Sequence, residues 1–599
     1  MTVSEKVAAL RGCMKEEGID LCLVPTDDFH GSEYVGDYFR CREWLTGFDG
    51  SAGTAVVTQE EALLWTDGRY FLQAASQLEG SGFTLMKIGE EGVPTIAEYV
   101  IRTLKTGGVL GFDGRCVSAY EGESFEEELA KKGASVKADT DLIDRIWTDR
   151  PKLSCRPVWE LPLEYAGKTR AEKLADLRGA MKKAECSVHV LTSLDDIAWL
   201  LNLRGDDVAC NPVFLSCLVV TAERVRLFVQ AKAVSRELAL RLAEDGISIE
   251  PYHAVYDFVW TIGDEVRVLM DKKHVNYRMW KAVGARKVDR TNPTLPAKAV
   301  KNPTEMECIR KAHIKDGLAV TRFMYWLKKR MEHYDPADGE TELSASAKLE
   351  GFRKEQEHYL GPSFDTISGY GPHGAIMHYE PTEETDAALK AEGFLLVDSG
   401  GQYLEGTTDI TRTFALGALT RKEKEIYTRV LRGTLALAAA KFKSGCTGMA
   451  FDYLARRPLW EAGLDYNHGT GHGVGFLLNV HEGPNSFSYR QVSGRSLPCV
   501  FEEGMVTSDE PGYYEEDAFG VRCENLILCV KDEKTEYGQF LRFETLTMVP
   551  WDLDAVLPEE MTQEERKLLN EYHEQVYNTL APLLNGEERE WLKKATRAV

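Results

Sequence analysis

The chain has 599 residues and a mass of 67.2 kDa, which at about 100 to 200 residues per domain predicts several domains. Its 95 acidic and 72 basic side chains give a net charge of -23. This field repels phosphate backbones and anionic lipids, so we expect no nucleic acid and no membrane as a partner. Hydrophobic residues make up 43 % of the chain, as in ordinary globular proteins, and no apolar run reaches the ~20 residues that span a bilayer.

The N-terminal residues and the cysteines both indicate a cytoplasmic protein. Residues 1–18 are charged and amphipathic, and they contain neither the apolar core nor the cleavage site of a signal peptide. The 13 cysteines are scattered from Cys13 to Cys529 without CxxC pairs. This spacing favours reduced thiols over a disulfide framework and argues against a zinc finger.

Two proline-bearing stretches predict the domain boundaries. Prolines interrupt residues 148–165 three times, so we expect an extended connector there. Residues 288–313 lead into Asn302 as a helix N-cap and Pro303 as the first helical residue, which predicts that a long helix begins a new domain. The expected domains are 1–155, 156–300 and 301–599.

The first two expected domains share a pattern. Residues 42–71 and 196–234 each place a Trp-Leu pair before a glycine-bearing turn, followed by two β-branched runs that a polar turn joins. Paired strands followed by an amphipathic helical pattern are typical of α/β domains. We therefore expect two related α/β domains.

The remainder of the chain mixes helical and strand patterns. Residues 394–398 form a continuous apolar run, as in a strand buried on both faces. Residues 407–414 alternate as a second strand, and the GGQYLEG segment between the two predicts a hairpin loop. Apolar residues within 427–438 recur at helical spacing, and we expect that helix to stop at Gly445.

Two aspartates at these strands are candidates for metal binding. Asp398 ends the buried apolar strand, where an ionised carboxylate is costly unless it is paired or bound to metal. The hairpin can bring Asp409 close to it, and close like charges require a cation or a shared proton. The alternative for Asp398 alone is a hydrogen-bonded cap of the SGG turn that follows.

The segment HGTGHGVG (468–475) is a second candidate. It places His468 and His472 four residues apart among four glycines. Glycine lets the backbone approach a ligand closely, and an imidazole held there can bind metal or donate to a substrate. A glycine-rich loop with ordinary histidines explains this motif equally well when it is taken alone.

Two glutamates complete a set of potential ligands. Glu510 precedes a Pro-Gly turn, and Glu524 lies in an apolar run whose composition normally excludes a carboxylate. Taken singly, each fits a turn or an ion pair. With Asp398, Asp409 and His472 they form an oxygen-rich set with one imidazole, which suits hard or borderline cations such as Mn²⁺. Four carboxylates balance two divalent ions, an arrangement that activates water for hydrolysis.

This ordered set, together with several longer stretches, carries a family resemblance. The chain resembles the pita-bread metallopeptidases, and among them it is similar to the long, three-domain, cytosolic aminopeptidases P over essentially its whole length. The resemblance implies an α/β and α+β fold, with two creatinase-N-like domains before a pita-bread catalytic domain with a C-terminal extension, and a homodimer. The matching stretches are FDGSAGTAVV, LWTDGRYFLQA, LDDIAWLLNLRG, VDSGGQYLEGTTDITRTF, HGTGHGVGFLLNVHEGP, EPGYYEEDAFGVRCENL and LNEYH.

The same resemblance implies the activity and the ligand set. Such an enzyme removes an N-terminal residue from peptides with proline at the second position, with a hydroxide between two divalent metal ions as the nucleophile. The ions are expected to be Mn²⁺, with Co²⁺ or Zn²⁺ as alternatives. In this chain Asp398 would chelate one ion, Asp409 and Glu524 would bridge both, and His472 and Glu510 would hold the other.

The resemblance also implies residues that act on the substrate. His378 and His481 would hydrogen-bond the scissile carbonyl or the developing tetrahedral intermediate, where negative charge accumulates. Glu510 would shuttle the proton. The residues that would line the substrate cleft and the proline pocket are His468, Tyr514 and Arg522.

Two other functions are compared with this interpretation, and three features of the sequence are not part of the expected site. Prolidase, which cleaves only Xaa-Pro dipeptides, is disfavoured by the chain length and the two N-terminal domains. A non-catalytic peptide- or protein-binding module with this fold should have lost ligands, and all five are present. Cys523 stands where relatives usually carry an aliphatic residue, and we expect a small buried hydrophobe. His373 receives no role, and WTDGRY (65–70) is interpreted as strand and turn.

Overall fold

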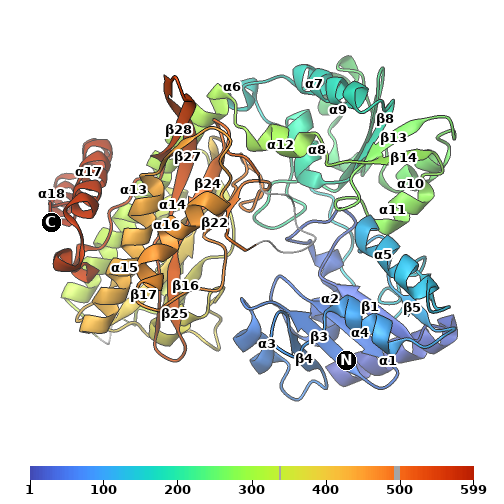
Figure 1. Cartoon of the computed structure of the whole chain (residues 1–599), viewed down its shortest axis with the longest axis horizontal. Coiled ribbons are helices and arrows are strands. Elements are labelled where there is room, and N and C mark those ends of the chain that lie inside the picture. The colour runs from blue at the N-terminus through green and yellow to red at the C-terminus, as the bar shows by residue number, and fades with distance from the viewer. Residues whose placement is uncertain (336–338, 491–498) are drawn as a thin grey trace. The chain divides into compact units, whose positions relative to one another are not determined.

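The computed structural model divides the chain into two units, each with its own sheets (Figure 1). Within the ranges described, every helix is too short or too polar to pass through a bilayer. The structure describes residues 1–335, 339–490 and 499–599; unit 1 comprises Met1–Pro162 and Lys168–Thr294, and unit 2 comprises Leu163–Gly167 and Leu295–Val599.

Unit 1 contains two six-stranded mixed sheets of identical topology. In each, the first strand pairs antiparallel with the second and parallel with the fifth. The strand order is fourth, third, second, first, fifth, sixth in both. This identity confirms the prediction of two related α/β domains. The sheets are β4(Thr84–Lys87)-β3(Ala62–Thr66)-β2(Thr54–Thr58)-β1(Leu21–Pro25)-β5(Val109–Gly111)-β6(Ser135–Lys137) and β12(Ile247–Pro251)-β11(Val225–Val229)-β10(Ser216–Thr221)-β8(Val188–Leu191)-β13(Arg267–Met270)-β14(Arg286–Asp289).

The helices of unit 1 begin and end at local signals. Helix α1 starts at a capping box between Thr2 and Glu5 and ends where Gly18 adopts a left-handed conformation. Its buried residues pack with β1 and β2 in one core cluster. The helices are α1(Val3–Glu17), α2(Cys41–Thr46), α3(Phe71–Gln77), α4(Ile96–Thr103), α5(Ala119–Ala130), α7(Arg170–Lys183), α8(Leu194–Leu201), α9(Arg236–Glu244), α10(Val255–Trp260) and α11(Tyr277–Ala282).

The predicted connector is extended only in part. Residues 151–158 have neither helix nor strand, as expected. The next two residues are also extended, as β7 (Trp159–Glu160), which pairs with β9 (Leu203–Arg204). The prediction is wrong only at the end of the stretch, where α6 (Leu163–Ala166) begins. Proline is compatible with the start of a helix, so Pro162 precedes α6 without disrupting it.

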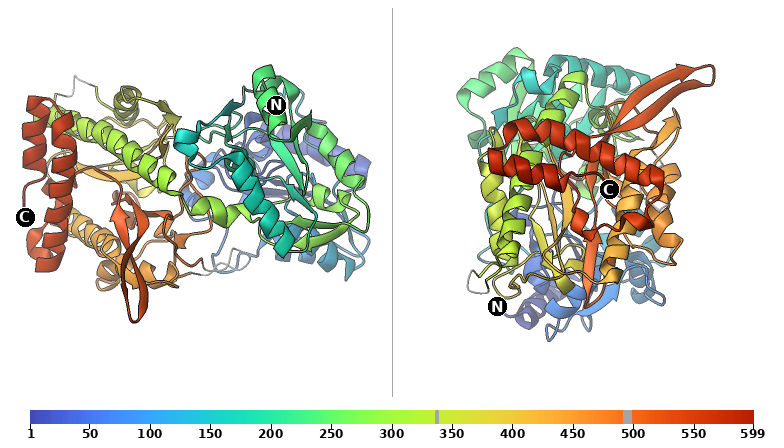
Figure 2. Two further views of the ribbon diagram at one scale, coloured as in Figure 1. Left: turned by 90° about the horizontal axis from the view of Figure 1, so that it is seen from above. Right: turned by 90° about the vertical axis from the view of Figure 1, so that its left-hand side faces the viewer.

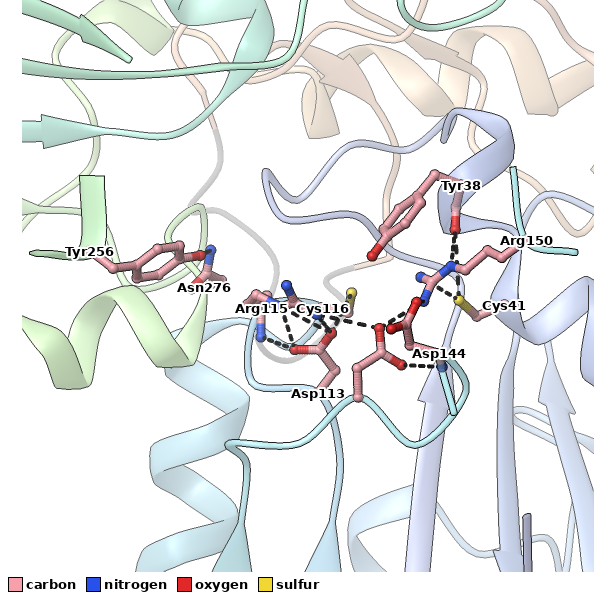
Figure 3. Close-up of polar contacts among 10 residues, drawn as sticks. Tyr38, Cys41, Asp113, Arg115, Cys116, Asp144, Arg150, Tyr256 and Asn276 are labelled. Carbon is pink, nitrogen blue, oxygen red and sulfur yellow. Dashed lines mark hydrogen bonds and ion pairs between the residues drawn. The ribbon is translucent and has the colours of Figure 1, made fainter. Parts of the chain in front are cut away.

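A set of partly buried ion pairs holds the loops beside the first sheet (Figure 3). Arg115 pairs with Asp113 at 2.8 Å and with Asp141 at 3.3 Å. Arg150 pairs with Asp141 at 2.8 Å and with Asp144 at 3.3 Å. Each of these aspartates therefore faces at least one guanidinium. We call these five residues the arginine cluster.

Unit 2 is built from antiparallel strands and long helices. Strand β17 lies between β16 and β20, and all six of its residues are buried. This confirms the predicted buried strand and its partner strand. The GGQYLEG segment between them is not a simple loop, because it contains β18 and the start of β19, which pair with each other. The strands are β15(Tyr359–Pro362), β16(Ile367–Tyr370), β17(Phe394–Ser399), β18(Gly401–Tyr403), β19(Gly406–Thr407), β20(Ile410–Ala415), β21(Lys441–Lys443), β22(Gly471–His472), β23(Ser486–Phe487), β24(Val506–Asp509), β25(Gly512–Glu515), β26(Phe519–Arg522), β27(Asn525–Thr535) and β28(Gly538–Thr545).

Two helix predictions in unit 2 have different outcomes. Helix α13 starts at Pro303 behind a capping box of Asn302 and Glu305, as predicted. Helix α15 ends at Ala438 and not at Gly445, because the chain after it pairs as β21 with β28. The helices are α12(Thr294–Ala299), which begins at the last residue of unit 1, α13(Pro303–Glu332), α14(Glu342–Lys354), α15(Arg421–Ala438), α16(Met449–Trp460), α17(Gln563–Leu580) and α18(Gly586–Ala595).

The C-terminal helices of unit 2 pack against helix α13. Helices α17 and α18 lie side by side, and both contact α13 (Figures 1 and 2). The far end of the β27–β28 hairpin projects from the rest of the unit (Figure 2). Cys523 is fully buried in the core cluster that includes α15 and α17, as predicted for a small hydrophobe.

Candidate functional site

Three carboxylates meet where the central strands of unit 2 end. Strands β17 and β20 pair with Asp398 opposite Thr411, and Asp409 directly precedes β20. Glu524 directly precedes β27. One oxygen from each of Asp398, Asp409 and Glu524 lies within 4.8 Å of the others, and all three residues are buried. The structure therefore brings together the carboxylates that the sequence singled out.

The carboxylates have little compensation from the chain. Arg522 donates to Oδ2 of Asp398 at 2.5 Å, and the Thr411 hydroxyl donates to Glu524 at 2.6 Å. Among the described residues, Oδ1 of Asp398 and Oε1 of Glu524 are buried and have no hydrogen-bond donor. Because a buried polar atom without a partner is costly, these are the atoms that a cation would satisfy.

Burial and mutual repulsion change the acidity of the cluster. Burial raises the pKa of Asp398 above its ordinary value, although the charge of Arg522 opposes the shift. Burial also raises the pKa of Asp409, and the neighbouring Asp398 adds to the effect. For Glu524 burial and the three nearby carboxylates raise the pKa well above its ordinary range. A raised pKa favours the protonated form of each carboxyl group, so a divalent ion would compete with a proton for the same oxygen atoms.

His472 is oriented toward the same group. Its Nδ1 lies 2.9 Å from the carbonyl oxygen of Gly473, which only accepts, so Nδ1 carries a proton. Its Nε2 lies 3.5 Å from Asp409 and 3.4 Å from Glu510. An imidazole nitrogen between two acceptors requires a proton or a cation. Although burial lowers it, the hydrogen bond to Asp409 and the charge of Glu510 raise the pKa of His472 to about 9.

Close backbone packing places His472 and Glu510. A Cβ on Gly471 would collide with the carbonyl oxygen of Ser508, so only glycine lets β22 approach β24 this closely. The Ser508 hydroxyl donates to Glu510 at 2.9 Å, and the backbone N–H of Glu510 donates to Thr470 at 2.9 Å. All five predicted ligands thus lie in one connected group, with Asp409 linking the aspartate side to His472. We call these five residues the acidic cluster.

The residues predicted for the substrate pocket form a hydrogen-bonded chain. Arg522 donates to the Tyr514 hydroxyl at 2.8 Å. The His468 Nδ1 donates to the carbonyl of Gly469 at 2.7 Å, so its Nε2 accepts from the Tyr514 hydroxyl at 2.9 Å. Burial lowers the pKa of His468 to about 4, which keeps the ring neutral. The sequence named these residues but did not predict that they connect to Asp398.

His481 lies beside His472, next to a pair of buried ion pairs that the sequence did not reveal. The two rings are perpendicular, with centroids 4.4 Å apart. The next residue, Glu482, is buried and pairs with Lys301 at 2.5 Å and with Lys298 at 3.3 Å. Although burial raises it, the charges of these lysines lower the pKa of Glu482. The ion pairs join positions about 180 residues apart, so no local pattern predicts them.

His378 lies in a separate segment. It is half-buried and follows the 3₁₀ helix η5 (Gly371–Ala375). This helix packs against β17, β25 and β26, the strands that carry Asp398, Tyr514 and Arg522. His373, to which the sequence analysis gave no role, donates from Nδ1 to Glu342 at 2.8 Å.

Four parts of the chain match models of known protein families. Residues 307–531 match metallopeptidase family M24, and residues 539–599 match the C-terminal region of peptidase M24. Residues 6–146 and residues 149–305 each match the creatinase/prolidase N-terminal domain. These two matches agree with the prediction of two related N-terminal domains.

Full-length relatives extend the similarity. The chain is 39 % identical to Xaa-Pro aminopeptidase 1 of Dictyostelium discoideum, over 99 % of this chain and 96 % of that protein. It is 38 % identical to Aminopeptidase P1 of Arabidopsis thaliana, over 100 % of this chain and 99 % of that protein. The crystal structure of X-prolyl aminopeptidase from Caenorhabditis elegans, described as a cytosolic enzyme with a di-nuclear active site, superimposes over 100 % of both chains with a TM-score of 0.94 and 35 % identity. This match confirms the predicted fold class.

Proposed function

Because the chain belongs to metallopeptidase family M24, and within it to the Xaa-Pro aminopeptidases, we propose that it hydrolyses the peptide bond between an N-terminal residue and a following proline. The observation that carries the proposal is the acidic cluster, in which buried carboxylates outnumber the cations that the chain supplies. A buried excess of carboxylate is the expected state of a metal site before its ions bind.

Two divalent ions are the cofactor that we propose, held by the acidic cluster. Asp398 would bind one ion, Asp409 and Glu524 would bridge the two, and His472 and Glu510 would bind the other. Their oxygen-rich donor set with a single imidazole favours Mn²⁺ over metals that prefer thiolates. When bound, such a pair polarises the scissile carbonyl and lowers the pKa of a water molecule for attack.

The side chains of the protein supply the remaining chemistry. Glu510, fixed by Ser508, accepts the proton of the attacking water and returns it to the proline nitrogen when the peptide bond breaks. His481, beside His472, donates a hydrogen bond to the oxygen on which negative charge develops, and His378 does so from its own segment. Both histidines are donors to the tetrahedral intermediate in this proposal.

The preference for proline follows from the missing amide proton. The bond before proline is a tertiary amide, so the following residue brings no N–H that must find an acceptor. Tyr514 and His468 already satisfy each other, and they present flat rings to the pyrrolidine. Any other residue at that position would bury an unpaired N–H, at a cost of about 1 to 3 kcal/mol.

Assembly, location and domain limits belong to the same proposal. We propose a cytoplasmic homodimer that acts on peptides, with domains at 1–155, 156–300 and 301–599. The cytosolic description of the Caenorhabditis elegans enzyme supports the location. The resemblance of the sequence motifs to dimeric aminopeptidases P supports the dimer.

A single assay tests the function. The protein is stripped with a chelator, reloaded with Mn²⁺, and given Arg-Pro-Pro, Arg-Ala-Ala and an Xaa-Pro dipeptide. We expect metal-dependent release of arginine from Arg-Pro-Pro and none from Arg-Ala-Ala. Cleavage of the dipeptide alone would identify a prolidase instead. No cleavage with Mn²⁺, Co²⁺ or Zn²⁺ would mean that the acidic cluster serves binding without catalysis.

A further inference from the structure

Glu342 is a buried carboxylate with an unusual set of donors. It is the first residue of α14, a position where acidic side chains commonly face solvent, yet it is fully buried. Its Oε1 accepts from the backbone N–H of Tyr370 at 2.6 Å and from Nδ1 of His373 at 2.8 Å. Its Oε2 accepts from the hydroxyl of Tyr379 at 2.9 Å and from the N–H of Ala387 at 3.0 Å. One carboxylate therefore satisfies four donors.

All four donors belong to the segment that carries His378. Two precede that histidine, Tyr379 directly follows it, and Ala387 lies at the end of the segment. The rings of His373 and Tyr379 also contact each other, with centroids 4.4 Å apart. Glu342 thus joins the two ends of the segment and the residue next to His378. Losing this acceptor would deprive partly buried donors of their shared partner and release the segment from α14.

The opposite side of the segment is held by backbone packing. A Cβ on Gly520 of β26 would collide with the carbonyl oxygen of Gly374 in η5. The segment therefore lies directly on the strand that ends at Arg522, the partner of Asp398. Between Glu342 and β26 it has little freedom to shift relative to the acidic cluster.

We infer that Glu342 is a positioning residue that sets the direction from which His378 reaches the scissile carbonyl. The inference rests on the proposed aminopeptidase function, in which His378 donates to the substrate. Glu342 does not touch substrate and acts only through the segment at 370–387. A hydrogen-bond donor misplaced by about 1 Å can lower a rate about 100-fold. Releasing this segment should therefore remove a large part of the rate enhancement that His378 provides.

The chain offers a matched control in the same unit. His358 donates from Nδ1 to Glu405 at 2.8 Å, the same distance as from His373 to Glu342. The exposed fractions of the two histidine side chains are also similar, 35 % for His358 and 31 % for His373. Glu405, however, lies between β18 and β19 and also binds Lys315. His358→Ala therefore removes an equivalent histidine–carboxylate hydrogen bond without touching the His378 segment.

The first measurement is steady-state hydrolysis of Arg-Pro-Pro by the Mn²⁺-loaded protein. Glu342→Gln keeps the size of the side chain but presents an N–H to the donors of Tyr379 or Ala387. We expect it to lower kcat about 30-fold with KM and bound manganese unchanged. His373→Ala and Tyr379→Phe should each lower kcat about 3- to 10-fold, and His358→Ala less than twofold. Equal losses in His373→Ala and His358→Ala would overturn the inference.

The second measurement asks whether Glu342 acts through His378. In a His378→Ala background, Glu342→Gln should cause no further loss of kcat, because the misplaced group is already absent. A second loss of about 30-fold in that background would show a separate structural effect and would overturn the inference.

Hydrogen exchange separates this inference from the proposed function. Glu342→Gln should raise amide exchange across 370–387 and leave 394–415 unchanged, whether or not the protein cleaves peptides. If the wild-type protein fails to cleave Arg-Pro-Pro and Glu342→Gln still raises exchange across 370–387, the result refutes the aminopeptidase function but not the anchoring by Glu342. Unchanged exchange across 370–387 would refute the anchoring itself.

Discussion

The arginine cluster of unit 1 and the acidic cluster of unit 2 both bring several carboxylates together, but they balance them differently. In the arginine cluster each aspartate has a guanidinium within 3.3 Å (Figure 3). In the acidic cluster one guanidinium and one imidazole face four carboxylates. In the first cluster the chain supplies a cationic partner for every carboxylate, whereas the second needs charge from outside.

The two clusters also differ in the direction in which their surroundings shift the pKa values of the ionisable groups. Although burial lowers it, the bonds to Asp113 raise the pKa of Arg115, so the guanidinium is held in its charged form. In the acidic cluster burial and neighbouring charges raise the pKa values of Asp398, Asp409 and Glu524. A group of carboxylates is therefore informative about function when its cationic partners are missing, not simply because the carboxylates lie close together.

The largest expected effect is a loss of peptidase activity when a carboxylate of the acidic cluster is replaced. Asp409→Asn removes the carboxylate that links both sides of the acidic cluster, so we expect kcat/KM for Arg-Pro-Pro to fall at least ~1000-fold, about 4 kcal/mol. Bound manganese should fall as well. The measurement is peptide hydrolysis together with metal content per chain.

The matched change in the other cluster is Asp113→Asn, which should leave kcat/KM within about twofold of wild type. A comparable loss of activity in both variants would mean that charge balance does not distinguish a functional cluster from a structural one.

The second effect is the dependence of metal stabilisation on pH. In the metal-free protein the carboxyl pKa values of Asp398, Asp409 and Glu524 lie above their ordinary value of ~4, and the pKa of His472 is about 9. Groups whose pKa is raised on folding stabilise the protein below the unfolded pKa and lose that contribution as pH rises through the folded value. The metal-free protein should therefore lose stability as pH rises above about 5.

Bound ions replace those protons, so the Mn²⁺-loaded protein should not show this loss. At a free concentration of 100 Kd each ion adds about 2.7 kcal/mol. We expect the difference in Tm between the Mn²⁺-loaded and the chelated protein to grow from about pH 5 to about pH 8. Thermal unfolding of both forms checks this, and a difference that shrinks over that range would contradict the proposed ligand set.

Local signals explain why part of the fold and site could be predicted. The start of α13 depends on Asn302, Pro303 and Glu305, which lie within four residues of one another. Asp398 stood out because a carboxylate ends an apolar strand, which is a contradiction visible within five residues. Such features follow from the chemistry of neighbours along the chain.

The residues that support the site could not be predicted in this way. Arg522 reaches Asp398 across 124 positions, and Lys301 reaches Glu482 across 181. Glu342 and His373 form ordinary local patterns, and only the fold brings them together. Tertiary pairing also ended α15 at Ala438, seven residues before the glycine that suggested its end. Long-range pairs carry no periodic or spacing signal.

The smallest expected effect tests the arginine cluster by stability. Asp113→Asn removes the charge that faces Arg115 at 2.8 Å, and Asp141 at 3.3 Å remains as a weaker partner. The loss should be about 1 to 3 kcal/mol, because a charged donor keeps only part of its compensation. Asp409→Asn should instead leave the chelated protein as stable as wild type or more stable, since it relieves repulsion among buried carboxylates. Denaturant unfolding of the chelated proteins measures both, and the two clusters are equivalent if both variants lose the same stability.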